Sequence, residues 1–235
     1  MQTVKVDRLN LETDDWVLDV GCGEGRHMHA AYWNNFVNVV GVDLDREVLE
    51  TTREGFKDVG NEHAGHWSVQ RADALRLPFP DNTFDTVICS EVLEHLPDYE
   101  TAIDELQRVM KPEGTAAVSV PRYGPEKICW MLSDEYHQVE GGHVRIFTQN
   151  QVKDSLKSAG FTLESTHYEH AAHSPFWWLK CLLWESKDSS FLVSTYNQIL
   201  ESGMLHYPTL LNWVESLLNP IMGKSYVLYF KGDPN

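Results

Sequence analysis

The chain has 235 residues and a formal net charge of −16, from 19 basic and 35 acidic residues. This length can bury a hydrophobic core without disulfides or metal ions. The acidic excess argues against a nucleic-acid-binding protein or one held on an anionic membrane, because both need a basic face.

The cysteines and the apolar runs indicate a reducing, aqueous environment. The cysteines show no regular spacing, which is typical of free thiols; they are Cys22, Cys89, Cys129 and Cys181. The first residues lack the apolar core of a signal peptide. The most apolar run, 176–184, is far shorter than the roughly 20 residues that span a bilayer. We therefore expect a cytoplasmic protein without stable membrane association.

Apolar runs and amphipathic segments alternate along the first half of the chain. We expect helices at 28–36, at 46–56 and from Pro97 in its first turn to the Pro112–Gly114 stop, and strands at 17–20, 37–43, 67–71, 84–89 and 115–120. Near-continuous apolar strands that alternate with helices predict a parallel sheet with helices on both faces.

The pattern changes after the fifth strand. Residues 122–147 look irregular and rich in charge and aromatics, a helix at 149–159 and a strand at 161–168 follow, and a last strand occupies 225–230. The residues between these two strands, 171–223, show no strand pattern, and we expect helices wherever a periodic pattern is recognisable. The last two strands fit a hairpin with a long insertion, because ordinary hairpin loops are far shorter.

These elements predict an α/β fold with a Rossmann-like, seven-stranded mixed sheet, mostly parallel with the last strand antiparallel. We expect a single domain over 1–235. The insertions 122–147 and 170–224 are expected to form a helical cap over the acceptor site, because ligands of open α/β sheets bind at the carboxyl edge.

A strand, a glycine turn and a helix follow one another at Val17-Leu-Asp-Val-Gly-Cys-Gly-Glu-Gly25. Glycine serves where the backbone takes a positive φ or approaches a ligand, and the helix start offers unpaired N–H groups. The corner suits a nucleotide-like ligand. Its glycines are out of register with the dinucleotide pattern Gly-x-Gly-x-x-Gly. Asp19 would repel a pyrophosphate but suits a cationic amino group, so the spacing disfavours NAD.

Five motifs between Val17 and Tyr168 resemble, in order, those of class I S-adenosylmethionine-dependent methyltransferases. The first is the glycine turn, and the others are Val40-Gly-Val-Asp43, Ala72-Asp-Ala74, the segment 90–96 and the segment 105–114. They are most similar to the type 11 subgroup, which includes quinone-biosynthesis methyltransferases. Lys-Pro-Glu-Gly replaces the commoner Lys-Pro-Gly-Gly in a surface turn.

The resemblance implies S-adenosylmethionine as the cofactor and a small-molecule acceptor. It implies that Asp43 holds the ribose hydroxyls and that Asp73 accepts from the adenine amino group. Either aspartate could instead only cap a helix or turn, where aspartate is favoured. The further cofactor-binding candidates lie at the same strand ends; they are Asp19, Gly21, Cys22, Gly23, Gly25, Leu44, Ala74 and Ser90.

Methyl transfer from a sulfonium is a displacement at carbon, in which the protein supplies alignment and desolvation. A base is needed only where the acceptor must lose a proton. The catalytic candidates are His143, His95 and Glu91. The histidines could equally make structural hydrogen bonds, and Glu91 could be a solvated acid at a helix start.

Aromatic residues crowd the segment 173–185. They either pack the insertion or line an apolar acceptor cavity. The substrate-binding candidates are Tyr136, Arg145, Trp177 and Trp178; Arg145 could bind an acceptor carboxylate or phosphate, or pair with Glu140. No metal is expected, because the loosely clustered histidines lack a cysteine or carboxylate partner at zinc spacing.

The sequence thus predicts an enzyme that transfers a methyl group by in-line SN2 displacement to a small molecule. If the aromatic segment lines an acceptor cavity, this molecule is expected to be lipophilic or aromatic. The alternative is a non-catalytic S-adenosylmethionine-binding regulatory or partner subunit. The acceptor, the methylated atom and the oligomeric state are left open.

Overall fold

The computed structural model describes residues 2–34, 36–57, 65–139 and 141–233. The chain divides into two compact units, the first made of residues 1–119, 150–166 and 227–235 and the second of 120–149 and 167–226. The second unit has nearly the bounds of the two expected insertions, whose role as a cap remains a prediction. Among the described residues, no helix is long and apolar enough to cross a membrane.

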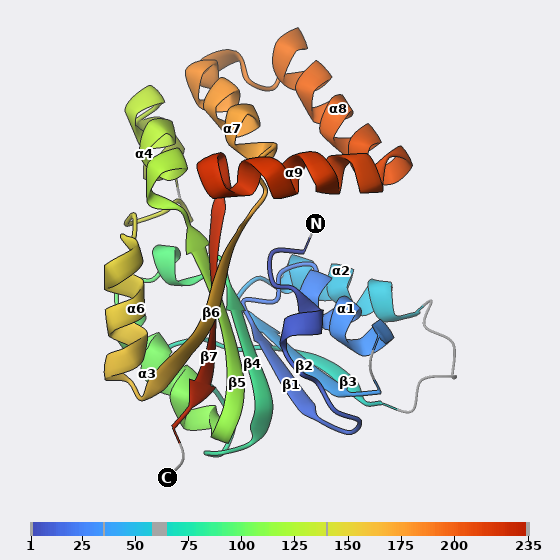
Figure 1. Cartoon of the computed structure of the whole chain (residues 1–235), viewed down its shortest axis with the longest axis vertical. Helices are drawn as coiled ribbons and strands as arrows, with labels where there is room; N and C mark the ends of the chain where they lie inside the picture. Colours follow the sequence, from blue (N-terminus) through green and yellow to red (C-terminus); the bar gives the residue numbers. More distant parts are fainter. Residues whose placement is uncertain (1, 35, 58–64, 140, 234–235) are drawn as a thin grey trace. The chain divides into compact units, whose positions relative to one another are not determined.

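A seven-stranded mixed sheet with the order β3-β2-β1-β4-β5-β7-β6 organises the first unit (Figure 1). Neighbouring strands from β3 to β5 pair in parallel, and the last strand is antiparallel. This confirms the predicted Rossmann-like fold. The strands are β1 (Trp16–Val20), β2 (Asn38–Asp43), β3 (Trp67–Arg71), β4 (Phe84–Ser90), β5 (Met110–Pro121), β6 (Phe161–Glu169) and β7 (Ser225–Gly232).

Helices cover both faces of the sheet, as near-continuous apolar strands require. Helices α1 (Arg26–Asn34) and α2 (Arg46–Lys57) lie on one side, and α3 (Tyr99–Val109) and α6 (Gln149–Ser158) lie together on the other (Figure 1). The buried residues of α2 recur at helical spacing, at Leu49, Thr52 and Phe56. The central strands are thereby buried, with Leu18 between Val40 and Val87 in the sheet.

Helix α3 begins and ends differently from its prediction. Pro97 precedes the helix, because Asp98 caps it by accepting the backbone N–H of Thr101 at 3.3 Å. The chain is already extended at Met110, which pairs with Phe84 in the sheet, before it reaches the predicted stop at 112–114.

The second unit contains α4 (Tyr123–Leu132), α5 (Glu135–Gln138), α7 (His173–Leu182), α8 (Phe191–His206) and α9 (Pro208–Met222). Helix α7 packs against α4 and α8, and α8 packs against α9. The expectation that 122–147 is irregular is therefore wrong for α4 and α5. Gly124-Pro125 resembles a turn, but proline is tolerated in a first helical turn, where its missing N–H has no partner to lose.

Candidate functional site

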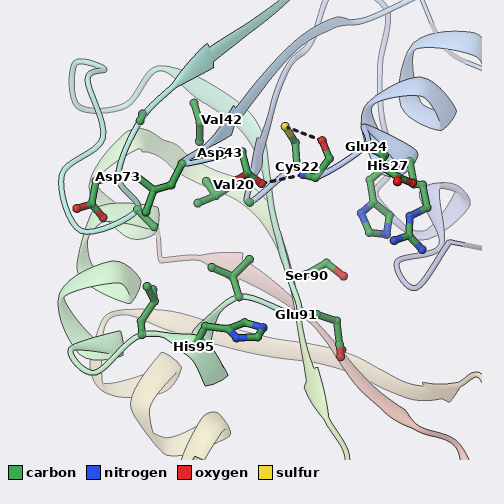
Figure 2. Close-up of a pocket in the computed structure, with 18 of the residues that line it drawn as sticks. Val20, Cys22, Glu24, His27, Val42, Asp43, Asp73, Ser90, Glu91 and His95 are labelled. Atoms are coloured by element: carbon green, nitrogen blue, oxygen red, sulfur yellow. Dashed lines mark hydrogen bonds between the residues drawn. The ribbon is translucent and has the colours of Figure 1, made fainter. Parts of the chain in front are cut away.

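A cavity of about 440 Å³ opens at the carboxyl ends of β1, β2 and β4 in the first unit (Figure 2). Ten of the predicted site residues line it: Gly21, Cys22, Gly23, Asp43, Leu44, Asp73, Ala74, Ser90, Glu91 and His95. Asp19 and Gly25 are not among the lining residues of the described chain. Thr3, Glu24, Arg26, His27, Val92 and Leu96 also line the cavity and were not predicted.

The glycine loop is held against the end of β2. The backbone N–H groups of Gly21 and Cys22 both donate to Val42 O, at 2.8 and 3.0 Å. Gly21 and Gly23 have φ angles of +70° and +52°, a region that favours glycine. A Cβ added at Gly21 would stand 2.3 Å from Val92 Cγ2, whereas one added at Gly23 would meet nothing within 4 Å. Gly23 therefore leaves the cavity open.

Asp43 joins the glycine loop to the start of α2. Its Oδ2 accepts the Gly23 N–H at 2.9 Å, and its Oδ1 accepts the Asp45 N–H at 3.0 Å. Asp43 is not the N-cap of α2, because the helix begins at Arg46 and Asp45 Oδ1 accepts the Glu47 N–H at 2.8 Å. Each carboxylate oxygen of Asp43 has two lone pairs, so its bonds leave acceptor capacity for ligand hydroxyls.

Asp73 and His27 lie at opposite ends of the cavity, with Asp43 between them (Figure 2). Asp73 Oδ1 accepts the Leu75 N–H at 3.0 Å and so shapes a turn after β3. Its carboxylate is also part of the cavity lining, which is compatible with both roles considered for it.

Asp19 is 1% exposed, and neither carboxylate oxygen makes a hydrogen bond of normal geometry within the described residues. Burial, together with the Asp43 carboxylate, raises the pKa of Asp19 to about 8, although the Met28 backbone N–H and Arg26 act in the opposite direction. Asp19 is therefore mostly protonated at neutral pH. Its predicted role beside a cationic amino group remains a prediction that requires the charged form.

His27 fixes the N-terminal segment at the edge of the cavity. Its Nε2 accepts the backbone N–H groups of Thr3 and Val4, each at 3.2 Å. Burial, followed by the charges of Arg26 and the N-terminus, lowers the pKa of His27 to about 4, so the ring is neutral. No pattern in the sequence indicates this contact, which joins residues 24 positions apart.

Ser90 and Glu91 meet Ser119 at the end of β4. The Oγ atoms of Ser90 and Ser119 are 2.8 Å apart, and Ser119 Oγ donates to Glu91 Oε1 at 3.0 Å. Glu91 has a φ of +58°, which is strained for a residue with a Cβ. Such strain persists where the surroundings enforce it and is common at functional sites.

The second catalytic candidate of this unit is His95, in the 3₁₀ turn Leu93–His95. Its Nε2 lies 3.9 Å from Oε1 of Glu94, whose side chain is fully buried. The structure thus places His95, Glu91 and the predicted cofactor residues other than Asp19 and Gly25 around one cavity (Figure 2).

The second unit contains His143, which contacts the buried Glu126. His143 Nδ1 lies 2.6 Å from Glu126 Oε1, and Glu126 also accepts from Trp130 Nε1 and the Tyr136 hydroxyl, at 3.1 and 3.3 Å. Burial opposes the charge of Glu126, but the His143 hydrogen bond and the Lys224 ammonium hold its pKa below the usual value. The carboxylate is therefore ionised and can orient the imidazole.

The aromatic substrate candidates pack inside the second unit. Tyr136 lies 5.7 Å from Trp177 between ring centroids, and Trp178 Nε1 donates to Pro125 O at 3.0 Å. Cys129, Tyr136 and Cys181 form the buried centre of this cluster. Much of the surface of these rings is therefore used to pack the second unit, which is one of the two roles expected for them. The Arg145 guanidinium lies 5.7 Å from the Phe147 ring centroid, and Glu140, its alternative partner, lies outside the described residues.

The four cysteines are free, as predicted, and all four are buried. Burial raises the pKa of the Cys22 thiol, so Cys22 contributes a neutral packing group to the cavity.

Residues 18–118 match a family model described as a methyltransferase domain. The chain is 32% identical over 172 residues to sterol 24-C-methyltransferase erg6 of Aspergillus fumigatus, covering 68% of this chain and 42% of that protein. It is 29% identical over 172 residues to 27-O-demethylrifamycin SV methyltransferase of Amycolatopsis mediterranei, covering 72% of this chain and 62% of that protein. The chain thus spans less than two thirds of either relative.

Among solved structures, geranyl diphosphate methyltransferase in complex with SAM superposes with a TM-score of 0.65 at 16% identity, covering 97% of this chain and 82% of that one. This similarity extends the common fold beyond the matched segment. Because the glycine loop, the acidic strand ends and the family model agree over residues 18–118, the chain carries a class I S-adenosylmethionine-dependent methyltransferase domain.

Proposed function

We propose that the chain transfers a methyl group from S-adenosylmethionine to a small, largely apolar acceptor. The observation that carries this proposal is the cavity at the carboxyl ends of β1, β2 and β4, lined by the glycine loop, Asp43 and Asp73. Ligands of open α/β sheets bind at this edge.

The lining fits a nucleoside with a cationic tail. Gly23 leaves space where any other residue would place a Cβ, and Asp43 retains lone pairs for two ribose hydroxyls. Leu44, whose side chain is 52% exposed, offers an apolar surface for an adenine ring, and Asp73 offers an acceptor for its amino group. Asp19 is buried two residues before Gly21 and is not part of the lining, but a nearby cation would favour the ionised form of its carboxyl group.

When bound, S-adenosylmethionine supplies a methyl group already activated by its cationic sulfur. The residues of this chain then hold the acceptor in line and exclude water, which lowers the barrier to such displacements. No protein nucleophile is required.

For an acceptor that must lose a proton, we assign the base to His143. A carboxylate that accepts from Nδ1–H fixes the tautomer and leaves the imidazole lone pair on Nε2. The 2.6 Å contact with buried, ionised Glu126 provides this arrangement. Glu126 acts as a positioning residue.

An apolar acceptor is favoured by the surface of the second unit. Helix α9 exposes Leu210, Trp213, Leu217 and Ile221, which recur every three or four residues and thus share one face. Exposed apolar patches often mark ligand or partner sites. The sterol named for one relative is an acceptor of this character.

Ligand binding to the full chain tests the cofactor assignment. S-adenosylmethionine and S-adenosylhomocysteine should raise the unfolding temperature, by an amount equivalent to about 2.7 kcal/mol at a hundredfold excess over Kd. NAD should not. Stabilisation by NAD alone would overturn the proposal.

Asp43→Ala should abolish the shift with S-adenosylmethionine, because hydrogen bonds to a charged group contribute about 1.5–3 kcal/mol each. Glu47→Gln, an exposed change on the following helix, is the matched control and should bind normally. Unchanged affinity in Asp43→Ala would mean that the ribose is held elsewhere.

Methyl-labelled cofactor and a panel of sterols, phenols and polyketides test the reaction. Turnover should fall by about 10²–10⁴-fold in His143→Asn if the acceptor loses a proton, while cofactor affinity stays unchanged. Tight cofactor binding without turnover on any acceptor would favour a regulatory subunit.

A further inference from the structure

Two histidines and a glutamate lie together in the second unit, and none of them belongs to the cavity or to the His143–Glu126 pair. His170 follows β6, His173 is the first residue of α7, and Glu215 lies in α9. One potential ligand atom from each lies within 4.8 Å of the others. His170 and Glu215 are buried, and the His173 side chain is 22% exposed.

The spacing is close to that of a bound metal ion. His173 Nδ1 lies 3.7 Å from Glu215 Oε1 and makes no hydrogen bond among the described residues. Two atoms that each lie about 2.0–2.2 Å from zinc are at most about 4.4 Å apart. Small rotations of the side chains would therefore bring all three onto one ion.

The surrounding backbone holds the three groups in place. Ala172 N–H donates to Glu215 Oε1 at 3.4 Å, and Ala171 N–H donates to Asn219 Oδ1 at 2.9 Å. Asn219 lies one turn after Glu215 on α9. His170 adopts a φ of +68°, a strained conformation that this frame maintains.

Charge compensation also favours a cation. Within the described chain, no lysine or arginine forms an ion pair with Glu215, whose contact with His173 Nδ1 spans 3.7 Å. A buried carboxylate costs free energy unless a positive charge offsets it. A divalent cation would do so while using the histidine lone pairs.

We propose that His170, His173 and Glu215 bind a divalent transition-metal ion, for which zinc is the best-suited candidate, and that this ion ties α9 to the junction of β6 and α7. Two histidines and one carboxylate are a recurrent ligand set for zinc and for other divalent first-row metals. The expectation of no metal site rested on partners near in sequence, and Glu215 is distant in sequence from both histidines.

Tag-free full-length protein, freed of metal with EDTA, tests the site by calorimetric titration with zinc chloride and by the visible ligand-field absorption of cobalt(II). The wild type should bind one equivalent, and zinc should raise its unfolding temperature. His173→Ala and Glu215→Gln should each lose zinc affinity by about 100-fold or more, since even supporting residues outside the coordination sphere contribute 10–100-fold.

His206→Ala and Glu201→Gln, which change exposed residues of α8, are matched controls and should bind zinc like the wild type. Retained binding of S-adenosylmethionine monitors the fold of each variant. If Glu215→Gln does not fold, His173→Ala decides, because its side chain is partly exposed. Absence of a stoichiometric site in the wild type, or unchanged zinc affinity in His173→Ala, would overturn the proposal.

Discussion

Gly21 and Gly23 share a positive φ but differ in their surroundings. A Cβ at Gly21 would collide with Val92, whereas a Cβ at Gly23 would project where nothing lies within 4 Å. Gly21 is therefore required by the packing of Val92, whereas a side chain at Gly23 would take space that a ligand in the cavity can use.

Gly21→Ala should lower the free energy of unfolding by about 3 kcal/mol or more, from overpacking added to backbone strain. Gly23→Ala should cost only the strain, about 1–2 kcal/mol, but should weaken S-adenosylmethionine binding. Gly160→Ala is the control, because Gly160 also has a positive φ and open surroundings but does not line the cavity. Chemical denaturation and calorimetry measure both quantities; normal cofactor affinity in Gly23→Ala would contradict this account.

Asp19 should make the protein less stable as pH rises. Its pKa is about 8 in the folded chain and near 3.8 when unfolded, so between these values the folded state holds a proton that the unfolded state has released. Stability then falls with pH, by up to about 1.4 kcal/mol per unit. Asp19→Asn should remove this slope, as followed by urea denaturation from pH 4 to 8. Parallel stability curves for the two proteins would argue against a protonated Asp19.

His27 should make the protein less stable as pH falls, over a lower pH range than that of Asp19. Its pKa is about 4 when folded and 6.5 when unfolded, so the unfolded state binds the extra proton as pH falls from 6.5 to 4. The stability from His27 is complete above pH 6.5 and is lost through this window, by about 2–3 kcal/mol. His27→Gln should flatten that part of the curve. A slope that persists in the variant would assign the effect to other groups.

At the scale of elements, most strands of the sheet could be predicted because they are apolar runs that end in a polar or glycine-rich turn; β3 and β6 are more polar. Helix α4 could not, because Gly124-Pro125 breaks the helical pattern and its stability comes from distant contacts. Trp178 on α7 donates to Pro125 O, and Cys129 packs against Cys181. The sequence around α4 does not indicate these partners.

Glu126 on α4 provides a test of those contacts. Glu126→Gln removes the charge that His143, Trp130 and Lys224 face, and breaking a buried pair in this way costs about 3–5 kcal/mol. Glu135→Gln alters an exposed carboxylate on α5 and should leave the free energy of unfolding almost unchanged. Denaturant titration measures both variants, and equal effects would mean that the Glu126 cluster does not stabilise the second unit.

At the scale of the whole molecule, most of the cavity lining was predictable, and the contacts between distant segments were not. Asp43 and Asp73 sit at strand ends, and the topology of a parallel sheet brings such ends to one edge. Three contacts join segments that are distant in sequence. They are His27 with the Thr3 backbone N–H, Glu126 with His143, and Glu215 with His173. No periodicity of the sequence encodes them, so only the folded structure reveals them.

The net charge of −16 predicts how the whole chain responds to salt. Self-repulsion disfavours the compact state, and raising the ionic strength from about 0.01 to 0.15 M shortens the Debye length from about 30 to 8 Å. The unfolding temperature should therefore rise with sodium chloride, by about 2–4 °C for each kcal/mol of relief. Lithium chloride should raise the unfolding temperature equally, because screening depends on ionic strength alone. EDTA in the buffer keeps divalent ions from His170, His173 and Glu215. A falling unfolding temperature would show instead that salt weakens attractive pairs, such as Arg108 with Glu105 and Asp81, more than it relieves repulsion.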